Sequence, residues 1–443
     1  MTVPASSNDI EATSEQKPQI NDNNIYILGL SYKNIPTTTD DNNNTPYQRG
    51  FISNIFSPPI IIDSPFQRDI ESRPFFTYRT RFEPLQMAEG GPSPMMFQRF
   101  IRDNPINSLE NIISNPDCFT TDIGWGCMIR TGQSLLANAL QLLLLDRHFT
   151  LKGSETNKAA MQIRRMIIGW FYDETSAPFS IQNFVKAGAK LCTLKPGEWF
   201  GPAATATSIK ELISNFPECG ITDCVISISS GDIPQDNIQD IFADNADAKI
   251  LILLGVKLGL SDVNPKYGDD ILKLLESKYS VGIAGGRPSS SFYFFGHEGP
   301  ELLYFDPHTP QNVLDSSTID TCISKTYGRL PVSEMDPSMM VGILIQSPQD
   351  WTAFVEECSD IRIINIVNSS VDDISETIEE FDICSMESTC SNESFHPVTS
   401  LSDVTNKDDY VNIQPLRDEF KSGTIFVDSP NSSQTAKREG NLV

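Results

Sequence analysis

Hydrophobic side chains follow regular spacings through the middle of the chain, from about residue 67 to 366. Residues 126–148 place apolar side chains at helical spacing, which predicts a long helix with a deeply buried face. Residues 249–260 begin as a continuous apolar run, typical of a buried strand. Residues 279–308 predict three strands separated by the turn signals GGRP and GHEGPE. Because helical and strand segments are grouped rather than strictly alternating, the pattern favours an α+β fold.

The segments outside this core are polar. Residues 1–24 and the Asn/Thr/Asp-rich stretch 36–48 lack periodicity, so we expect both to be disordered or to form loops. The short apolar stretch 23–32 between them predicts a strand that joins the core. The predicted parts are a disordered N-terminal tail (1–24), an N-terminal segment partly packed on the core (25–66), the folded domain (67–366) and a disordered acidic C-terminal tail (367–443).

Composition supports this division. The apolar fraction of the 443 residues is 39%, below the roughly 45–50% of globular proteins. The formal charge is 33 − 58 = −25. Residues 372–443 alone contain 15 acidic and 5 basic side chains, a net of −10, and such a segment buries too little apolar surface to fold. The acidic balance argues against nucleic-acid binding and against electrostatic docking on anionic lipid.

The ends and the cysteines suggest a cytosolic protein. No run of about 18 apolar residues predicts a membrane span, and the first residues have neither a basic nor an apolar region typical of a signal peptide. The nine cysteines are an odd number without a Cys-x-x-Cys pair, so we expect free thiols. Cys219 and Cys224 come closest to a metal-binding pair, and that interpretation is weak. No nucleophile elbow of a serine hydrolase and no phosphate-binding loop is present.

Cys127 is the first candidate for chemistry. It lies in DIGWGCMIRTGQ, where a loop containing Gly124 and Gly126 enters the predicted long helix. The free N–H groups and positive dipole end of a helix favour the thiolate, which is the nucleophilic form of cysteine. The alternative is a buried cysteine that serves only as a small hydrophobic residue.

His308 strengthens the catalytic interpretation. It follows a predicted strand in LLYFDPHTP, and Asp306 precedes it by two residues. Residues i and i+2 of a strand share a face, so the carboxylate is expected to orient the imidazole. A cysteine, a histidine and an orienting carboxylate are the parts of a thiol protease. The alternative for this motif is a polar turn in which Asp306 caps the backbone. His148, His297 (expected in a hairpin turn) and His396 are weaker candidates.

Five segments of the core together resemble the autophagins, the cysteine proteases that process the ubiquitin-like modifier of autophagy. These segments are DIGWGCMIRTGQSLLANAL, GEWFGP, GIAGGRPSSSFYFFG, YFDPHTPQ and DPSMMVG. The resemblance extends from about residue 24 to 346, and the stretch 84–120 is closest to fungal members. It implies a papain-like α+β fold with a small accessory subdomain, and no metal or organic cofactor.

The resemblance also assigns roles to matched positions. Cys127 matches the nucleophile, His308 the general base and acid, and Asp306 the residue that orients the imidazole. Tyr78 matches a tyrosine that forms the oxyanion hole together with the Cys127 N–H. From the residues alone, Tyr78 is equally well a half-buried core aromatic.

The channel for the substrate is implied in the same way. Trp199 matches a tryptophan that flanks this channel, and Gly285, Gly286, Arg287 and Pro288 match a loop that gates it. Without the resemblance, a tryptophan beside proline and glycine belongs to a core or turn, and a glycine pair to an ordinary turn. A narrow channel of this kind admits a residue without a side chain and excludes larger ones.

The implied function is a cysteine protease with two tasks. It exposes the C-terminal glycine of the modifier precursor, and it later cleaves the amide between that glycine and phosphatidylethanolamine. The expected location is the cytoplasm, with transient presence at the site of autophagosome assembly and the nucleus as a further candidate. Contact with autophagic membranes is expected only through the lipid-linked substrate. The alternatives are an isopeptidase for another ubiquitin-like modifier and a non-catalytic adaptor that binds the modifier.

The acidic tail contains one candidate docking motif. Tyr410 and Ile413 have the spacing of an aromatic and an aliphatic anchor, and acidic residues precede them. Such peptides add a strand to the sheet of a modifier and fill two pockets. Chance is the alternative, because the pattern is loose. Residues 32–35 (YKNI) fit the same pattern without acidic flanks and are expected to pack on the core.

Overall fold

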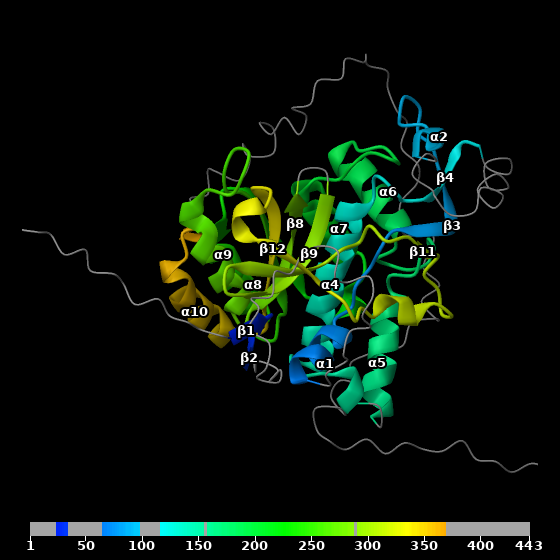
Figure 1. Ribbon diagram of the computed structural model, residues 1–443. Helices are drawn as coiled ribbons and strands as arrows, with labels where there is room; N and C mark the ends of the chain where they lie inside the picture. Colours follow the sequence, from blue (N-terminus) through cyan, green and yellow to red (C-terminus); the bar gives the residue numbers. More distant parts are fainter. Residues whose placement is uncertain (1–23, 34–63, 98–115, 155–156, 288–289, 369–443) are drawn as a thin grey trace, which may run out of the picture.

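The computed structural model describes residues 24–33, 64–97, 116–154, 157–287 and 290–368 (Figure 1). In these ranges a mixed nine-stranded sheet forms the centre, in the order β12-β10-β9-β8-β13-β7-β5, with β1 and β2 attached through β9. Its strands are β1 (Asn24–Ile27), β2 (Leu30–Lys33), β5 (Asp223–Ser229), β7 (Ile250–Lys257), β8 (Ser280–Arg287), β9 (Ser290–Glu298), β10 (Glu301–Phe305), β12 (Gly328–Pro331) and β13 (Ser338–Ile345).

The described residues also form two smaller sheets. One contains β3 (Arg79–Gln86), β4 (Cys118–Thr121) and β11 (Gln311–Asn312), and the other contains β6 (Asp232–Pro234) and β14 (Asn365–Val367). The helices are α1 (Pro65–Ser72), α2 (Pro94–Phe97), α4 (Cys127–Leu145), α5 (Lys158–Gly169), α6 (Ile181–Cys192), α7 (Pro202–Ser214), α8 (Gln235–Asp244), α9 (Gly268–Glu276) and α10 (Pro348–Glu357). No helix in the described ranges is both long enough and apolar enough to cross a membrane.

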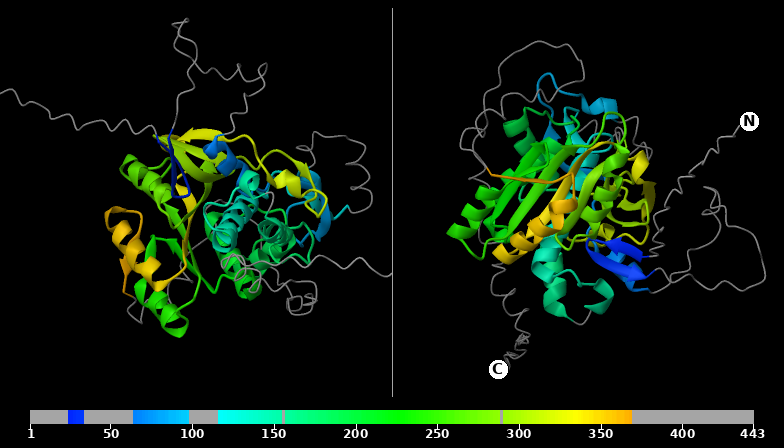
Figure 2. Two further views of the ribbon diagram at one scale, coloured as in Figure 1. Left: turned by 90° about the horizontal axis from the view of Figure 1, so that it is seen from below. Right: turned by 90° about the vertical axis from the view of Figure 1, so that its left-hand side faces the viewer.

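Helices cover both faces of the large sheet. Figure 2 shows α4–α7 on one side and α8–α10 on the other. In β7, Leu251 and Leu253 pack into the core with α4, whereas Ile250, Ile252 and Leu254 pack into a second core with α9 and α10. A strand buried on both faces needs apolar residues at every position, which explains the continuous apolar run in the sequence.

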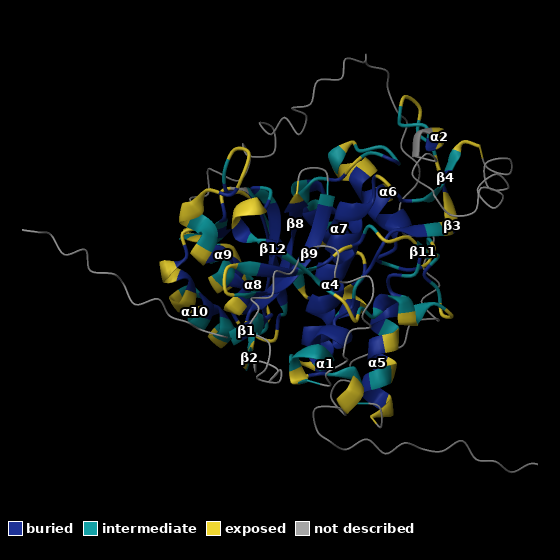
Figure 3. Cartoon of the chain, in the orientation of Figure 1, coloured by how far each residue is buried: buried dark blue, intermediate teal, exposed yellow. Residues whose placement is uncertain are grey.

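The predicted long helix is α4, and all of its 19 residues are buried (Figure 3). Its polar side chains bind the extended segment 72–77 that runs beside it. Ser134 Oγ accepts from the Phe76 N–H, at 3.0 Å. Asn138 and Gln141 donate to the carbonyls of Pro74 and Ser72, both at 2.9 Å. These bonds fix the path of the chain into Tyr78.

The predicted first strand is a hairpin of two strands, β1 and β2. Leu28 and Gly29 have φ angles of 43° and 83°, the positive values that a two-residue hairpin turn of type I′ requires at both positions. The hydrophobic pattern did not indicate this turn, because the apolar Leu28 continues the apolar run of the strand. Tyr32 on β2 donates from its hydroxyl to Asp69 at 2.9 Å and contacts Phe66, as expected for a core-associated residue.

The predicted domain boundaries, at residues 24/25, 66/67 and 366/367, stay predictions. The tails 1–23 and 369–443 and the whole Asn/Thr/Asp-rich stretch 36–48 lie outside the described residues, as do Tyr410 and Ile413.

Candidate active site

Cys127 is the first residue of α4, and a glycine loop brings it there. The N–H groups of Trp125 and Gly126 both donate to the Asp122 carbonyl, at 3.2 and 2.8 Å, and close the loop. Gly124 has a φ of +89°, and a Cβ on Gly126 would lie 2.6 Å from the Asp122 side chain. Both glycines are therefore needed in the loop that precedes Cys127.

The Cys127 thiol is buried, with the residue only 2% exposed. Burial alone would raise its pKa, but hydrogen bonds outweigh this effect and lower the pKa below the usual value for cysteine. They come from the His308 side chain, the Ser291 backbone and the Trp199 side chain, and the charge of His308 adds to them. The thiolate is thus favoured by specific partners, which is the requirement for a nucleophilic cysteine.

Asp306, Pro307 and His308 follow β10 in a turn. The expected sharing of a strand face was wrong, because β10 ends at Phe305. Asp306 Oδ1 instead accepts from the backbone N–H of His308 at 2.9 Å and lies 2.6 Å from its Nδ1. The polar turn and the oriented imidazole, which the sequence presented as alternatives, are therefore one arrangement.

The imidazole and the thiol form a coupled pair. Burial lowers the pKa of His308, but Asp306 and then Cys127 outweigh it and raise the pKa to about 9. Burial raises the pKa of Asp306, and its bonds to His308 more than reverse this. Since Asp306 occupies Nδ1, Nε2 is the nitrogen left for the thiol. No hydrogen bond of ideal geometry reaches Nε2 within the described residues, and loose contacts of this kind are common in unliganded sites.

Tyr78 lies beside both groups. Its N–H donates to the Pro307 carbonyl and its carbonyl accepts from the Gln311 N–H, both at 2.8 Å. Its ring meets the His308 imidazole edge-on with centroids 5.3 Å apart. Burial, and then the nearby Cys127, raise the pKa of the hydroxyl. Tyr78 therefore stays a protonated donor at the reacting sulfur.

The channel residues are divided between two segments. Trp199 precedes α7 and is 48% exposed, yet its side chain lies near enough to the Cys127 thiol to help lower the pKa of that thiol. Gly285, Gly286 and Arg287 are not a turn, since β8 continues through Arg287 and pairs with Ser290 and Ser291. A Cβ on Gly286 would lie 1.9 Å from a backbone oxygen of this partner strand, so the strands approach too closely for any side chain. Pro288 lies outside the described residues.

Other candidates play no part in this site. Cys219 and Cys224 are buried in the core, and burial raises the pKa of Cys219 to about 12 and that of Cys224 higher still. No group of three or more potential metal ligands occurs among the described residues. His297 is not in a turn as expected: it is buried in β9, with Nε2 3.1 Å from Glu276.

Sequence reasoning missed several residues that contact this site. The Ser291 backbone helps lower the pKa of the thiol, and the Ser291 hydroxyl lies 2.7 Å from that of Thr131 on α4. Asp122 and Arg130 flank Cys127 as a buried ion pair at 2.6 Å. One signal was available for Arg130, because a charge in the first turns of a helix predicted to be deeply buried needs a buried partner.

The site brings together a nucleophilic sulfur, a base, a carboxylate that orients the base and a hydroxyl donor. This arrangement is suited to acyl transfer.

Comparison with known proteins supports this chemistry. Residues 63–357 match the model of the peptidase C54 catalytic domain. The chain is 47% identical over 385 residues to "Cysteine protease ATG4" of Saccharomyces cerevisiae, covering 86% of this chain and 75% of that protein. It is also 47% identical over 365 residues to "Probable cysteine protease ATG4" of Vanderwaltozyma polyspora (80% and 87% covered) and 41% identical over 424 residues to "Cysteine protease ATG4" of Kluyveromyces marxianus (94% and 87%). The relatives are fungal, as the sequence predicted, and the papain-like α+β class is confirmed. The chain belongs to the peptidase C54 family of autophagy cysteine proteases, and it is a thiol hydrolase.

Proposed function

We propose that Cys127, His308 and Asp306 cleave an acyl bond at the C-terminal glycine of an autophagy ubiquitin-like modifier. The Cys127 thiolate attacks the glycyl carbonyl, and the Tyr78 hydroxyl and the Cys127 N–H stabilise the resulting oxyanion. The N–H is free for this role because the first residues of a helix have no intrahelical acceptor. His308 protonates the leaving amine and then activates the water that hydrolyses the thioester.

The observation that carries the proposal is the convergence of three side chains on one sulfur. Tyr78 packs against the buried Cys127, and its ring lies 5.3 Å from the His308 imidazole. His308 and Trp199 both lower the pKa of the thiol. Each of the three supplies a different requirement: a base, an oxyanion donor and a wall. The exposed Trp199 indole near the sulfur leaves little room beside the attacked carbonyl, which favours a residue without a side chain. The close approach of β8 and β9 at Gly286 brings a second wall near the sulfur through Ser291.

Two leaving groups fit the same mechanism. In the precursor the leaving group is the amine of the peptide after the glycine, and in the membrane-linked modifier it is the amine of phosphatidylethanolamine. Both bonds are amides of the same glycine, so one site serves both. The protein would then meet autophagic membranes only through its lipid-linked substrate. We accordingly place it in the cytoplasm, with transient presence where autophagosomes assemble and the nucleus as a further compartment.

The test combines the full-length protein with purified modifier precursor and, separately, with phosphatidylethanolamine-linked modifier in vesicles. Mass spectrometry then identifies the products. We expect both to end at the glycine, and we expect Cys127→Ala to yield neither product while still binding the modifier. Processing by Cys127→Ala, or products that end elsewhere, would contradict the proposal.

The same assay separates the alternatives. Cleavage of ubiquitin or another modifier, with the autophagy modifier untouched, would indicate a different isopeptidase. Binding without cleavage by the unaltered protein would indicate an adaptor.

For the candidate docking motif at Tyr410 and Ile413, we expect deletion of residues 408–414 to weaken modifier binding and to leave hydrolysis of a small peptide ester unchanged. Unaltered binding would exclude the motif.

A further inference from the structure

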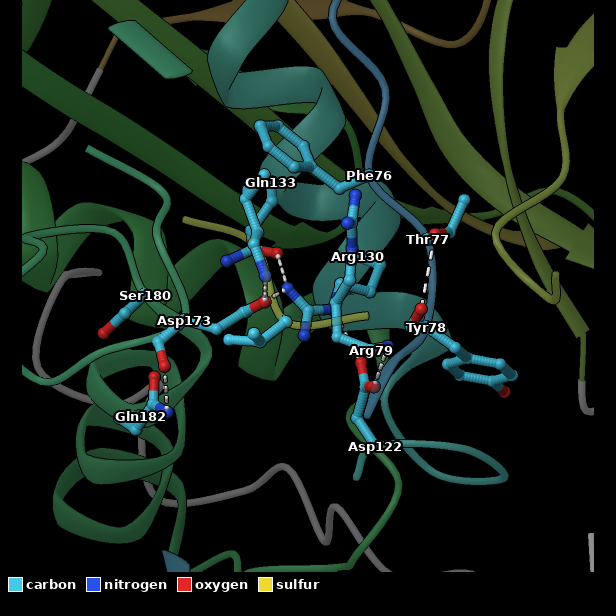
Figure 4. Close-up of polar contacts among 12 residues, drawn as sticks. Phe76, Thr77, Tyr78, Arg79, Asp122, Arg130, Gln133, Asp173, Ser180 and Gln182 are labelled. Atoms are coloured by element: carbon cyan, nitrogen blue, oxygen red, sulfur yellow. Dashed lines mark hydrogen bonds and ion pairs between the residues drawn. The ribbon is translucent and has the colours of Figure 1, made fainter. Parts of the chain in front are cut away.

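A buried ion network lies directly beneath the site. Asp122, Arg130 and Asp173 have side chains that are fully buried. Arg130 bridges the two carboxylates: its Nε lies 2.6 Å from Asp122 Oδ2 and its Nη1 lies 2.7 Å from Asp173 Oδ1. Figure 4 shows this bridge, with the ring of Tyr78 pointing away from it.

Each carboxylate uses its second oxygen to accept from a backbone N–H, Asp122 beside Tyr78 and Asp173 just beyond β11. Asp122 Oδ1 accepts from the N–H of Arg79, the next residue after Tyr78, at 2.6 Å. Asp173 Oδ2 accepts from the Leu314 N–H at 2.7 Å. Leu314 follows β11, the strand that holds the Tyr78 carbonyl through the N–H of Gln311. The network therefore binds backbone next to Tyr78 and backbone just after the strand that pairs with the Tyr78 carbonyl.

The network also holds the nucleophile. Arg130 lies one turn along α4 from Cys127, and the Asp122 carbonyl closes the glycine loop in front of it. Burial opposes the charge of Arg130, but the two carboxylates outweigh it and raise its pKa, so the guanidinium stays cationic. Burial likewise raises the pKa of Asp122, against Arg130 and the Arg79 N–H. Both Asp122 oxygens accept from N–H donors, which fits the ionised carboxylate.

Stability alone does not explain such a network. Buried ion pairs are often no more stabilising than well-packed apolar residues of similar volume, because the charges lose their hydration. What charged groups provide is direction, since each carboxylate oxygen here fixes one N–H at a set distance. The backbone N–H groups fixed in this way are those of Arg79, next to Tyr78, and of Leu314, after β11. The Arg130 side chain links both carboxylates to α4, which carries Cys127.

We propose that Asp122, Arg130 and Asp173 are positioning residues that hold the Tyr78 hydroxyl over the Cys127 sulfur. They touch neither substrate nor reacting atoms and act through the backbone at Arg79 and Leu314. This inference rests on the proposed role of Tyr78 as oxyanion donor.

A double-mutant cycle tests the proposal. Turnover of the modifier precursor is measured for the full-length protein, Asp122→Asn, Tyr78→Phe and the double variant. We expect Asp122→Asn to lower kcat roughly 10- to 100-fold with KM nearly unchanged, because only the transition state uses the oxyanion donor. Once Tyr78 lacks its hydroxyl, its position no longer matters. The double variant should then lose little more than Tyr78→Phe alone.

The control is Asp270→Asn. Asp270 is equally buried and binds Arg362 at 3.0 Å, but it lies on α9 in the second core. It should lower the melting temperature without a change in kcat. Arg130→Lys is the second variant in case Asp122→Asn does not fold, since an ammonium group keeps the charge but does not reproduce the two-armed bridge. The same coupling with Tyr78→Phe is expected for it.

Two results would overturn the inference. If the losses in the double variant multiply, the network acts independently of Tyr78. If the melting temperature falls but kcat per folded molecule is unchanged, as expected for the control, the network is merely structural. Alkylation of Cys127 by iodoacetamide needs no protein substrate. If Cys127 is alkylated normally but the unaltered protein cuts no modifier, the proposed substrate is wrong and not the positioning.

Discussion

The site has a closed half and an open half. The closed half contains Tyr78 and Cys127, which are 5% and 2% exposed and rest on the buried Asp122–Arg130 ion pair. The open half contains the side chains of Asp306 and His308, which are 51% and 28% exposed, and Trp199, which is 48% exposed. Groups that must not move are thus built into the core, and groups that meet the substrate face solvent.

The two halves use different physics. In the closed half, donors and charges are held by several hydrogen bonds each, so geometry is fixed before the substrate arrives. In the open half, a single carboxylate orients the imidazole, and solvent screens the interaction. Substitutions in the closed half should therefore affect the chemical step alone, whereas those in the open half should also change pH dependence or selectivity.

The largest effect should follow from removing the sulfur. Cys127→Ala should lower kcat for precursor processing by at least about 10³-fold, because no other nucleophile is present at the start of α4. The helix should persist, since alanine is the best helix former. Circular dichroism and a single-turnover assay would check this. Residual turnover of more than a few per cent would show that the closed half does not contain the nucleophile.

Removing the oxyanion hydroxyl should come next. Tyr78→Phe keeps the ring contact with His308 and deletes one donor, a change that typically costs about 10²- to 10³-fold in kcat. KM should change little. Steady-state kinetics with the precursor would separate the two parameters. A change in KM alone would mean that Tyr78 binds substrate rather than the transition state.

The pH profile should report the coupled pair. The raised pKa of His308 means that its proton leaves only as the pH rises through about 9, so the imidazolium and the thiolate coexist below that value. The lowered pKa of Cys127 moves the acid limb below the usual thiol range. The rate of Cys127 alkylation against pH would show both limbs, as macroscopic values of the pair. In His308→Ala the thiol loses its strongest partner, and alkylation at pH 7 should slow roughly tenfold or more. An unchanged alkylation rate would mean that His308, in the open half, does not act on the Cys127 sulfur.

The sequence predicted the elements better than the connections between them. The long helix, the buried strand at 249–260 and the three strands at 279–308 follow from hydrophobic spacing, and the structure contains all of them. Cys127 and His308 could be paired because a glycine loop before a helix and an Asp-Pro-His turn have local signatures. The pairing of β11 with β3, which brings the His308 segment to Tyr78, joins residues more than 200 positions apart. No local pattern encodes such a contact.

The buried ion network shows the same limit. Asp173 lies in YDETSA, an ordinary polar stretch, and its burial depends on Leu314 and α4 arriving from elsewhere in the chain. Likewise, Gly285 and Gly286 predict a turn from composition, but the pairing of β8 and β9 extends through both. Tertiary contacts, and not local propensity, determine the structure at these positions.

Trp199→Ala should produce a smaller, selective effect. Loss of the indole opens the wall beside the sulfur, so a substrate with alanine in place of the terminal glycine should gain relative to the glycine substrate. One methyl group corresponds to about 1–3 kcal/mol of discrimination, or roughly 10- to 200-fold. The ratio of kcat/KM for the two substrates measures it. The thiol should also lose a group that lowers its pKa, so that pKa should rise. Unaltered selectivity would mean that Trp199 does not wall the channel.

The smallest effect should come from the exposed ion pair beside the channel. Arg287 on β8 contacts Glu334, and their side chains are 51% and 53% exposed. Solvent-exposed pairs of this kind contribute about 0–1 kcal/mol, so Arg287→Gln should leave the melting temperature almost unchanged. Because the side chain lies at the open half, any effect on turnover should appear in KM and weaken with added salt. Thermal unfolding and kinetics at two salt concentrations would test this, with Glu334→Gln as the matched control. A fall in kcat that salt does not alter would show that the end of β8 contributes to chemistry, and the division into two halves would then fail at this strand.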